Sequence, residues 1–103
     1  MKDRIMLDPS TTIQRSDRVE YRSLGDGEGG VLLHLDTAAY HGVNEVGALI
    51  WTLIEGITFQ ELLHELRARL SDIPPNFEED IADFIADLTA RNLVSCASSR
   101  GDG

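Results

Sequence analysis

Residues 31–44 read Val-Leu-Leu-His-Leu-Asp-Thr-Ala-Ala-Tyr-His-Gly-Val-Asn and predict two short strands that meet at Asp36-Thr37. The second strand, residues 38–43, carries small side chains and neither proline nor an acidic or basic charge. The other strands of its sheet come earlier in the chain, so this strand is expected at the edge, where N–H and C=O groups stay unpaired. Natural proteins usually protect such an edge with charge or proline. We therefore predict an edge that is left open for a guest peptide.

The charge of the chain argues against a nucleic-acid partner. Its 103 residues are the size of a single domain and carry a formal net charge of −9, from 18 acidic and 9 basic residues. Neutralisation of phosphates supplies much of the affinity of proteins for DNA and RNA. The few basic residues do not cluster, so binding to nucleic acid is not expected. An acidic surface can instead attract a basic or polar peptide.

Neither the N-terminal residues nor the apolar runs indicate a membrane. Residues 1–9 are charged and lack the apolar core of a secretion signal. The longest apolar run, residues 46–54, is too short to span a bilayer. The single cysteine, Cys96, cannot form an internal disulfide. These features predict a cytoplasmic protein without a membrane partner.

The predicted domain covers residues 18–94, between two segments without regular structure. Residues 1–17 show weak periodicity and are predicted to be a flexible N-terminal arm. Residues 95–103 are small and polar, which predicts a disordered tail. Within the domain, residues 18–24 alternate as a strand, and residues 25–30 form a glycine-rich hairpin loop.

Three helices are predicted after the strands. Asn44 is a favourable N-cap for the first, which is expected to end at Gly56. Thr58 and Glu61 form a capping box for the second, and Asn76 caps the third after a proline pair. Apolar side chains recur at helical spacing: Val46, Leu49, Ile50, Leu53 and Ile54, with Trp51 expected in the core beside them; Leu62, Leu63, Leu66 and Leu70; and Phe77, Ile81, Phe84, Ile85 and Leu88.

This order of elements predicts an α+β domain with a three-stranded antiparallel sheet followed by three helices, similar to a winged helix-turn-helix. In a winged helix the third helix normally reads DNA. Here that helix carries five carboxylates and one arginine: Glu78, Glu79, Asp80, Asp83, Asp87 and Arg91. Carboxylates repel the phosphate backbone, so this helix is not expected to read DNA.

No arrangement of reactive side chains predicts catalysis or metal binding. His34, His41 and His64 lack a metal-ligand spacing, and His34 and His64 are expected on the surface. The carboxylates lie on predicted exposed helix faces and lack the desolvated cleft that acid–base catalysis requires. No serine-nucleophile motif is present. The sequence therefore predicts a protein without enzymatic activity, cofactor or metal.

Five segments within residues 18–94 carry a family resemblance. They are Val31-Leu-Leu-His-Leu-Asp-Thr; Tyr40; Val43-Asn44-Glu-Val-Gly-Ala-Leu-Ile-Trp51; Ile54-Glu-Gly-Ile-Thr-Phe-Gln-Glu-Leu62; and Asp80-Ile-Ala-Asp-Phe-Ile-Ala-Asp-Leu-Thr-Ala-Arg-Asn-Leu-Val94. These segments resemble the PqqD-like family, the precursor-peptide recognition elements of ribosomally made, post-translationally modified peptides. As a chain with no attached enzyme, the protein most resembles the stand-alone leader-binding protein of lasso-peptide biosynthesis.

The resemblance implies that the leader segment of a precursor peptide binds as an added strand, antiparallel to the third strand and beside the third helix. The protein would perform no chemistry. It would deliver the precursor to a leader peptidase of transglutaminase-like type and, as a further partner, to the cyclase. The expected peptide-binding residues are Ala39, Tyr40, His41, Gly42 and Val43 on the strand, and Asp80, Asp83, Phe84 and Asp87 on the helix. Proline at His41 is expected to weaken leader binding where the N–H of that residue points outward.

Two other interpretations stay open. One is an acidic winged-helix regulatory protein, which salt-dependent binding to duplex DNA would favour. The other is an accessory subunit of another peptide-modifying enzyme, which a clustered polar pocket would favour. A short precursor gene beside genes for a peptidase and a cyclase would favour the leader-binding adaptor.

Overall fold

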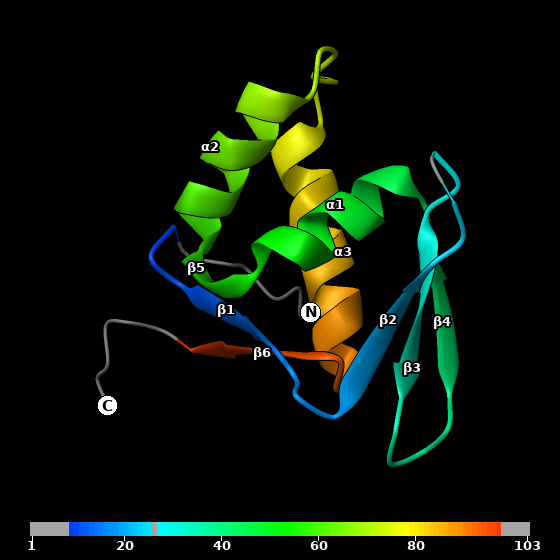
Figure 1. Cartoon of the computed structure of the whole chain (residues 1–103). Coiled ribbons are helices and arrows are strands. Elements are labelled where there is room, and N and C mark those ends of the chain that lie inside the picture. The colour runs from blue at the N-terminus through cyan, green and yellow to red at the C-terminus, as the bar shows by residue number, and fades with distance from the viewer. Residues whose placement is uncertain (1–8, 26, 98–103) are drawn as a thin grey trace.

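Six strands and three helices make up the described part of the chain, residues 9–25 and 27–97 of this computed structural model. In chain order they are β1 (Thr12–Arg15), β2 (Val19–Ser23), β3 (Gly30–His34), β4 (Tyr40–Val43), α1 (Glu45–Leu53), β5 (Glu55–Thr58), α2 (Phe59–Arg69), α3 (Phe77–Ala90) and β6 (Val94–Ala97). The strands form two antiparallel sheets, ordered β5-β1-β6 and β2-β3-β4. Figure 1 shows the helices above the first sheet and the second sheet to one side. The predicted α+β class, with antiparallel strands and three helices, is confirmed.

The predicted three-stranded sheet is β2-β3-β4, and the glycine-rich loop joins its first two strands. Ser23 of β2 pairs with Gly30 of β3, and Leu33 of β3 pairs with Tyr40 of β4. β4 starts at Tyr40 rather than at residue 38. The reason is that Ala38 has a φ of +62°, a left-handed turn conformation that does not continue a strand.

The β5-β1-β6 sheet consists of segments that the sequence analysis did not predict as strands. The predicted flexible arm is wrong for residues 12–15, because β1 pairs with both β5 and β6 and fully buries Ile13. The predicted disordered tail is wrong for residues 95–97, which belong to β6. Residues 1–8 and 98–103 lie outside the described residues. Ile13 is the single apolar side chain of β1, so the local sequence shows no strand pattern.

The N-terminal caps of α1 and α2 agree with the sequence. Asn44 Oδ1 accepts a hydrogen bond from the N–H of Gly47 at 2.8 Å, which confirms the predicted N-cap of α1. Thr58 and Glu61 form the predicted capping box of α2, with both hydrogen bonds at 3.1 Å. Each cap satisfies N–H groups that have no partner within the helix.

Two helix ends differ from the prediction. α1 ends at Leu53, and Gly56 has its positive φ of +75° inside β5 instead of closing the helix. Asn76 precedes α3 as predicted, but its side chain caps no N–H group. After α3 the chain turns back, so that Leu93 and Val94 are buried as expected. None of the described helices is both long and apolar enough to cross a membrane.

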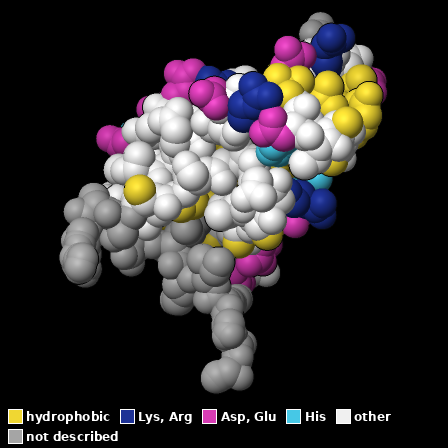
Figure 2. All heavy atoms as spheres, turned by 90° about the horizontal axis from the view of Figure 1, so that it is seen from below, with side chains coloured by type: hydrophobic (Ala, Val, Ile, Leu, Met, Phe, Trp, Pro, Cys, Tyr) yellow, Lys and Arg dark blue, Asp and Glu magenta, His cyan; other side chains and the backbone are white. Residues whose placement is uncertain are grey.

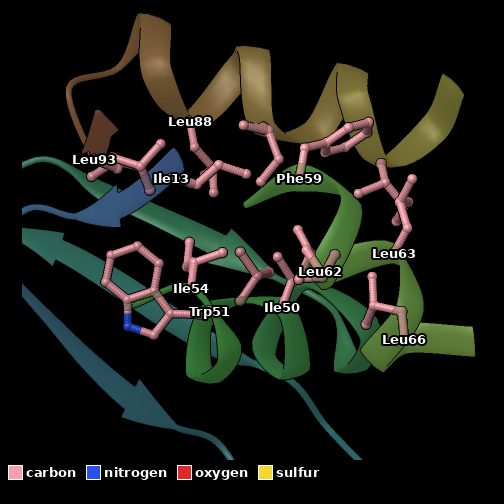
Figure 3. Packing of buried hydrophobic residues seen from close by; sticks show 14 of the residues in the cluster. Ile13, Ile50, Trp51, Ile54, Phe59, Leu62, Leu63, Leu66, Leu88 and Leu93 are labelled. Atoms are coloured by element: carbon pink, nitrogen blue, oxygen red, sulfur yellow. The ribbon is translucent and has the colours of Figure 1, made fainter. Parts of the chain in front are cut away.

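The hydrophobic core lies between the three helices and the β5-β1-β6 sheet (Figure 3). Its fully buried large side chains are Ile13, Leu32, Ile50, Ile54, Leu62, Leu66, Ile85 and Leu88. Leu32 comes from β3 and joins the second sheet to this core. Trp51 is buried, as predicted, whereas the predicted surface position of His34 is wrong. The buried His34 ring has a polar partner, because its Nδ1 accepts a hydrogen bond from the N–H of Asp36 at 3.2 Å.

An ion pair ties the turn before β4 to the start of β2, and it makes a testable prediction. Arg18 Nε and Nη2 donate to Asp36 Oδ1 at 3.0 and 2.7 Å. This hydrogen bonding lowers the pKa of Asp36 below its ordinary value, so the pair stabilises the fold fully above the unfolded pKa and loses this effect as pH falls through the folded pKa. In a carbon-13 NMR titration we expect the Asp36 carboxyl to titrate at lower pH than in the Arg18→Gln variant. Equal midpoints would contradict the pairing.

Candidate functional site

β4 is an edge strand with one unpaired side. In the sheet order β2-β3-β4 it pairs with β3 alone, and no strand of the described residues lies on its other side. Figure 1 shows it at the margin of the molecule. The described N-terminal residues do not cover this edge, because β1 lies in the other sheet. Within residues 9–25 and 27–97, the predicted edge of β4 is therefore open.

The register determines which backbone groups of β4 face outward. The N–H of His34 donates to the C=O of Ala39 at 2.9 Å. His34 and Ala39 therefore form a hydrogen-bonded pair. Along antiparallel strands such pairs alternate with pairs that are not hydrogen-bonded, so the next hydrogen-bonded pair is Leu32 and His41. The backbone groups of His41 therefore point into the sheet. Those of Tyr40 and Gly42 point away from it, and they offer two N–H donors and two C=O acceptors to a neighbour.

This alternation corrects the expectation for proline at His41. The N–H of His41 points toward β3, so proline at that position would disturb the sheet rather than the open edge. The outward donors belong to Tyr40 and Gly42. Sequence reasoning places the strand at the edge, but it does not determine which of its residues direct their N–H and C=O groups outward.

The side chains of His41 and Val43 lie on the inner face of the sheet, where β4 is next to α3. Val43 is buried, and His41 faces α3, with its Nε2 3.7 Å from Asp87 Oδ2. That separation exceeds a hydrogen bond, and the Asp87 carboxylate instead accepts from Arg91 Nε at 3.1 Å. Of the predicted strand and helix residues, His41 and Asp87 therefore lie next to each other between β4 and α3.

A hollow of about 560 Å³ opens beside the Asn44 end of β4. Its walls come from the start of α1, the loop between α2 and α3, and the first half of α3. The lining residues are Asn44, Val46, Gly47, Ile50, Leu70, Ser71, Asp72, Pro74, Phe77, Asp80, Ile81 and Phe84. Most of these side chains are apolar, so the hollow is suited to an apolar group with a few polar contacts at its rim.

Gly47 allows β4 and α3 to approach α1 at this hollow. A Cβ at this position would lie 3.0 Å from Val43 Cβ and 3.1 Å from Phe84 Cζ, closer than such atoms normally pack. A glycine within a helix costs about 1 kcal/mol relative to alanine. Close packing accounts for its presence and keeps the Phe84 ring at the wall of the hollow.

The predicted site residues do not all lie together. Asp80 and Phe84 line the hollow, whereas His41 and Asp87 face each other between β4 and α3. Asp83 is exposed on α3 and does not line the hollow. Ala39 precedes β4, Tyr40 and Gly42 carry the outward backbone groups, and Val43 packs inside.

Sequence reasoning missed the α1 and loop walls of the hollow. The sequence predicts Asn44 only as a cap, Leu70 only as part of the apolar stripe of the second helix, and Pro74 only as one of the prolines that end that helix. The mid-helix Gly47 indicates close packing and the proline pair indicates a bend, but neither signal shows which residues enclose the hollow. Among the described residues, no three His, Cys, Asp or Glu side chains lie together as a metal-binding group.

Comparison with known proteins shows a family match and a similar solved structure. Residues 29–94 match the family described as coenzyme PQQ synthesis protein D (PqqD). The chain is also similar to the structure titled "TbiB1 in Complex with the TbiA(beta) Leader Peptide", with 35% sequence identity and a TM-score of 0.68. That alignment covers 80% of this chain and 94% of the other. Comparison with curated proteins finds no match.

Proposed function

Because the chain belongs to the PqqD family, we propose that it is a non-catalytic adaptor that binds the leader segment of a ribosomally made precursor peptide. The observation that carries the proposal is the unpaired side of β4, with the outward backbone groups of Tyr40 and Gly42. The similarity to a chain solved with a leader peptide supports it.

The leader binds as a strand antiparallel to β4. β4 runs toward Asn44, so the N-terminal part of an antiparallel guest lies at the Asn44 end, beside the hollow. Main-chain hydrogen bonds to Tyr40 and Gly42 supply affinity that tolerates sequence change, and the hollow supplies selectivity for an apolar side chain. Affinity and specificity thus come from two neighbouring parts of one site.

The negative charge of α3 adds a preference for neutral or basic side chains in the bound leader. Glu78, Glu79, Asp80, Asp83 and Asp87 are all exposed on this helix. Of these, Glu78 is paired with Arg67 at 2.7 Å and Asp87 with Arg91 at 3.1 Å. A guest with neutral or basic side chains on this side avoids charge repulsion. The same charges oppose DNA binding by α3.

The adaptor then raises the concentration of the precursor at its processing enzymes. We assign it to the lasso-peptide type, in which a leader peptidase of transglutaminase-like type and a cyclase act on the delivered precursor. Tethering through the leader makes the second encounter intramolecular, which increases its effective concentration. The adaptor itself contributes no reacting group.

Isothermal titration calorimetry tests the proposal. The probes are the TbiA(beta) leader peptide and the leader of a precursor encoded beside this gene. We expect one-to-one binding with a Kd in the micromolar range or below. This Kd corresponds to a binding free energy of about −8 kcal/mol or a more negative value. Failure of both leaders to bind, together with salt-dependent binding to duplex DNA, would favour the regulatory alternative instead.

Phe84 is expected to anchor the leader at the hollow. The Phe84→Ala variant should bind the leader at least about tenfold more weakly, because an apolar contact of about 2 kcal/mol is removed. Calorimetry on the folded variant measures this change. Glu79→Ala, on the same helix but outside the hollow, is the matched control and should stay within about twofold of wild type. Equal affinities for both variants would place the anchor elsewhere.

A further inference from the structure

β2 is the other edge strand of the β2-β3-β4 sheet. It pairs with β3 alone, and no strand within residues 9–25 and 27–97 pairs with its other side. Figure 1 shows β2 and β4 on opposite sides of β3. The C=O of Arg18 and the N–H of Leu24, which flank β2, are hydrogen-bonded toward the β3 side of the hairpin at 2.8 and 3.0 Å. Because hydrogen-bonded positions alternate, the outward backbone groups of β2 belong to Val19, Tyr21 and Ser23.

The two charged side chains of β2 have opposite signs and lie on one face. Glu20 pairs with Leu33 of β3, and Arg22 pairs with Val31, so both project on the outer face of the sheet, where they are exposed. Within the described part of the chain, neither takes part in an ion pair. Charge commonly protects an edge strand from pairing. Two charges of alternating sign, however, do not repel a second copy of the strand that runs antiparallel.

A second copy of β2 complements this edge when the two strands run antiparallel about a two-fold axis at Tyr21. Tyr21 then lies opposite the partner's Tyr21, and Val19 opposite the partner's Ser23, so every outward N–H and C=O group of β2 gains a hydrogen-bond partner. Glu20 lies opposite the partner's Arg22, and such opposite charges are stabilising. Sliding one strand by two residues would set two glutamates or two arginines opposite each other, so the pattern favours this register.

The inner side of the β2 edge has room for side chains of the second copy. A hollow of about 380 Å³ adjoins this edge, and it is lined by Gln14, Arg15, Ser16, Asp17, Val19, Tyr21 and Trp51. Val19 and Tyr21 are half-buried and pack against the core. In the two-fold pairing the partner's Tyr21 lies opposite Tyr21 on this face. The two rings then cover each other, and aromatic pairs across strands are stabilising.

From these features we infer that the chain forms a symmetric dimer through β2, with one continuous sheet in the order β4-β3-β2-β2-β3-β4. The occupant of the β2 edge is thus a second copy of the chain. The inference goes beyond the proposed function and does not depend on leader binding. Both β4 strands lie at the outer ends of the joined sheet, so each copy keeps its own open edge and the dimer carries two of them.

The net charge of the chain makes this dimer weak without preventing it. Each copy carries a net charge of −9, which opposes association. Charges that are further apart than about 8 Å are largely screened at physiological ionic strength, whereas the paired Glu20 and Arg22 side chains are close together. Figure 2 shows acidic and basic side chains next to each other along the upper margin of the molecule, so this margin is not of one sign. One strand from each copy makes a small interface, which is typical of transient association.

Sedimentation velocity with charge-exchange variants tests the dimer. We expect wild type to dimerise with a Kd of about 0.1 mM. Glu20→Arg sets arginine opposite arginine, and Arg22→Glu sets glutamate opposite glutamate, so each should raise the dimer Kd at least about tenfold. The double variant Glu20→Arg with Arg22→Glu exchanges the two charges and should return to within about twofold of wild type. Both residues are exposed, so these variants keep the fold.

Two controls separate the β2 edge from other causes of association. Glu79→Arg, at an exposed position of α3, changes the net charge as much as Glu20→Arg does and should not weaken the dimer. Gly42→Pro obstructs the β4 edge and should dimerise like wild type. A wild-type chain that stays monomeric at about 1 mM, single variants that dimerise normally, a double variant that stays monomeric, or loss of the dimer in Gly42→Pro would each overturn the inference. Failure of the leader to bind an intact dimer would instead refute the proposed function alone.

Discussion

Replacing Gly42 with proline is expected to abolish detectable leader binding while leaving the fold intact. The N–H of Gly42 points away from β3, so its loss breaks no hydrogen bond of the sheet. The proline ring removes a main-chain donor from the open edge and occupies the place where a guest strand must lie. A lost hydrogen bond alone costs about 1 kcal/mol, and the steric block adds to it. We expect at least a hundredfold increase in Kd by calorimetry, with thermal unfolding close to that of wild type.

Two control variants isolate the missing donor. Gly42→Ala keeps the N–H, and its Cβ meets no atom within 4 Å, so leader affinity and stability should stay near those of wild type. His41→Pro removes a donor that points into the sheet and should lower the unfolding free energy by about 1–3 kcal/mol. If Gly42→Pro binds the leader as tightly as Gly42→Ala, strand addition at β4 is wrong.

Replacing Ile13 with alanine is expected to destabilise the protein by about 2–4 kcal/mol. Ile13 is fully buried and lies in β1, between β5 and β6. Its truncation leaves a cavity where both sheet partners and the core meet. For a domain of this size, the change corresponds to a fall in Tm of roughly 10 °C or more. Urea unfolding and thermal unfolding, both followed by circular dichroism, measure it.

The matched control is Gln14→Ala, one residue further along the same strand. Gln14 is exposed, and its truncation should change the unfolding free energy by less than about 0.5 kcal/mol. A flexible arm would make both variants neutral, so a stable Ile13→Ala protein would contradict the β5-β1-β6 sheet. A large effect for Ile13 alone would show that the folded domain begins before residue 18.

The caps of α1 and α2 and the hairpin were predictable because they depend on neighbouring residues. Asn44 caps α1 through an N–H three residues away, and Thr58 and Glu61 satisfy each other over the same distance. The glycine-rich loop lies between two alternating strands that are close in the chain. Such interactions are encoded within a few residues, so their patterns can be read without knowledge of the fold.

The β5-β1-β6 sheet was not predictable from local pattern. β1 contains one apolar residue, and its register joins Thr12 to Thr58 on one side and to Ala97 on the other. A strand with so little local signal is stabilised by partners that lie far away in the sequence. The buried position of His34 has a similar origin, since it depends on the fold placing a backbone donor next to the ring.

The sequence by itself determined the α+β class, the edge position of a strand within residues 38–43, the acidic surface of α3 and the family resemblance. The tertiary structure alone decided which groups of that edge face outward and which walls enclose the neighbouring hollow. The physical reason is that the outward-facing residues of β4 depend on its register with β3, and the turn at Ala38 sets that register. The hollow, in turn, forms where α1, α3 and the loop after α2 meet, and no contiguous stretch of sequence contains all three.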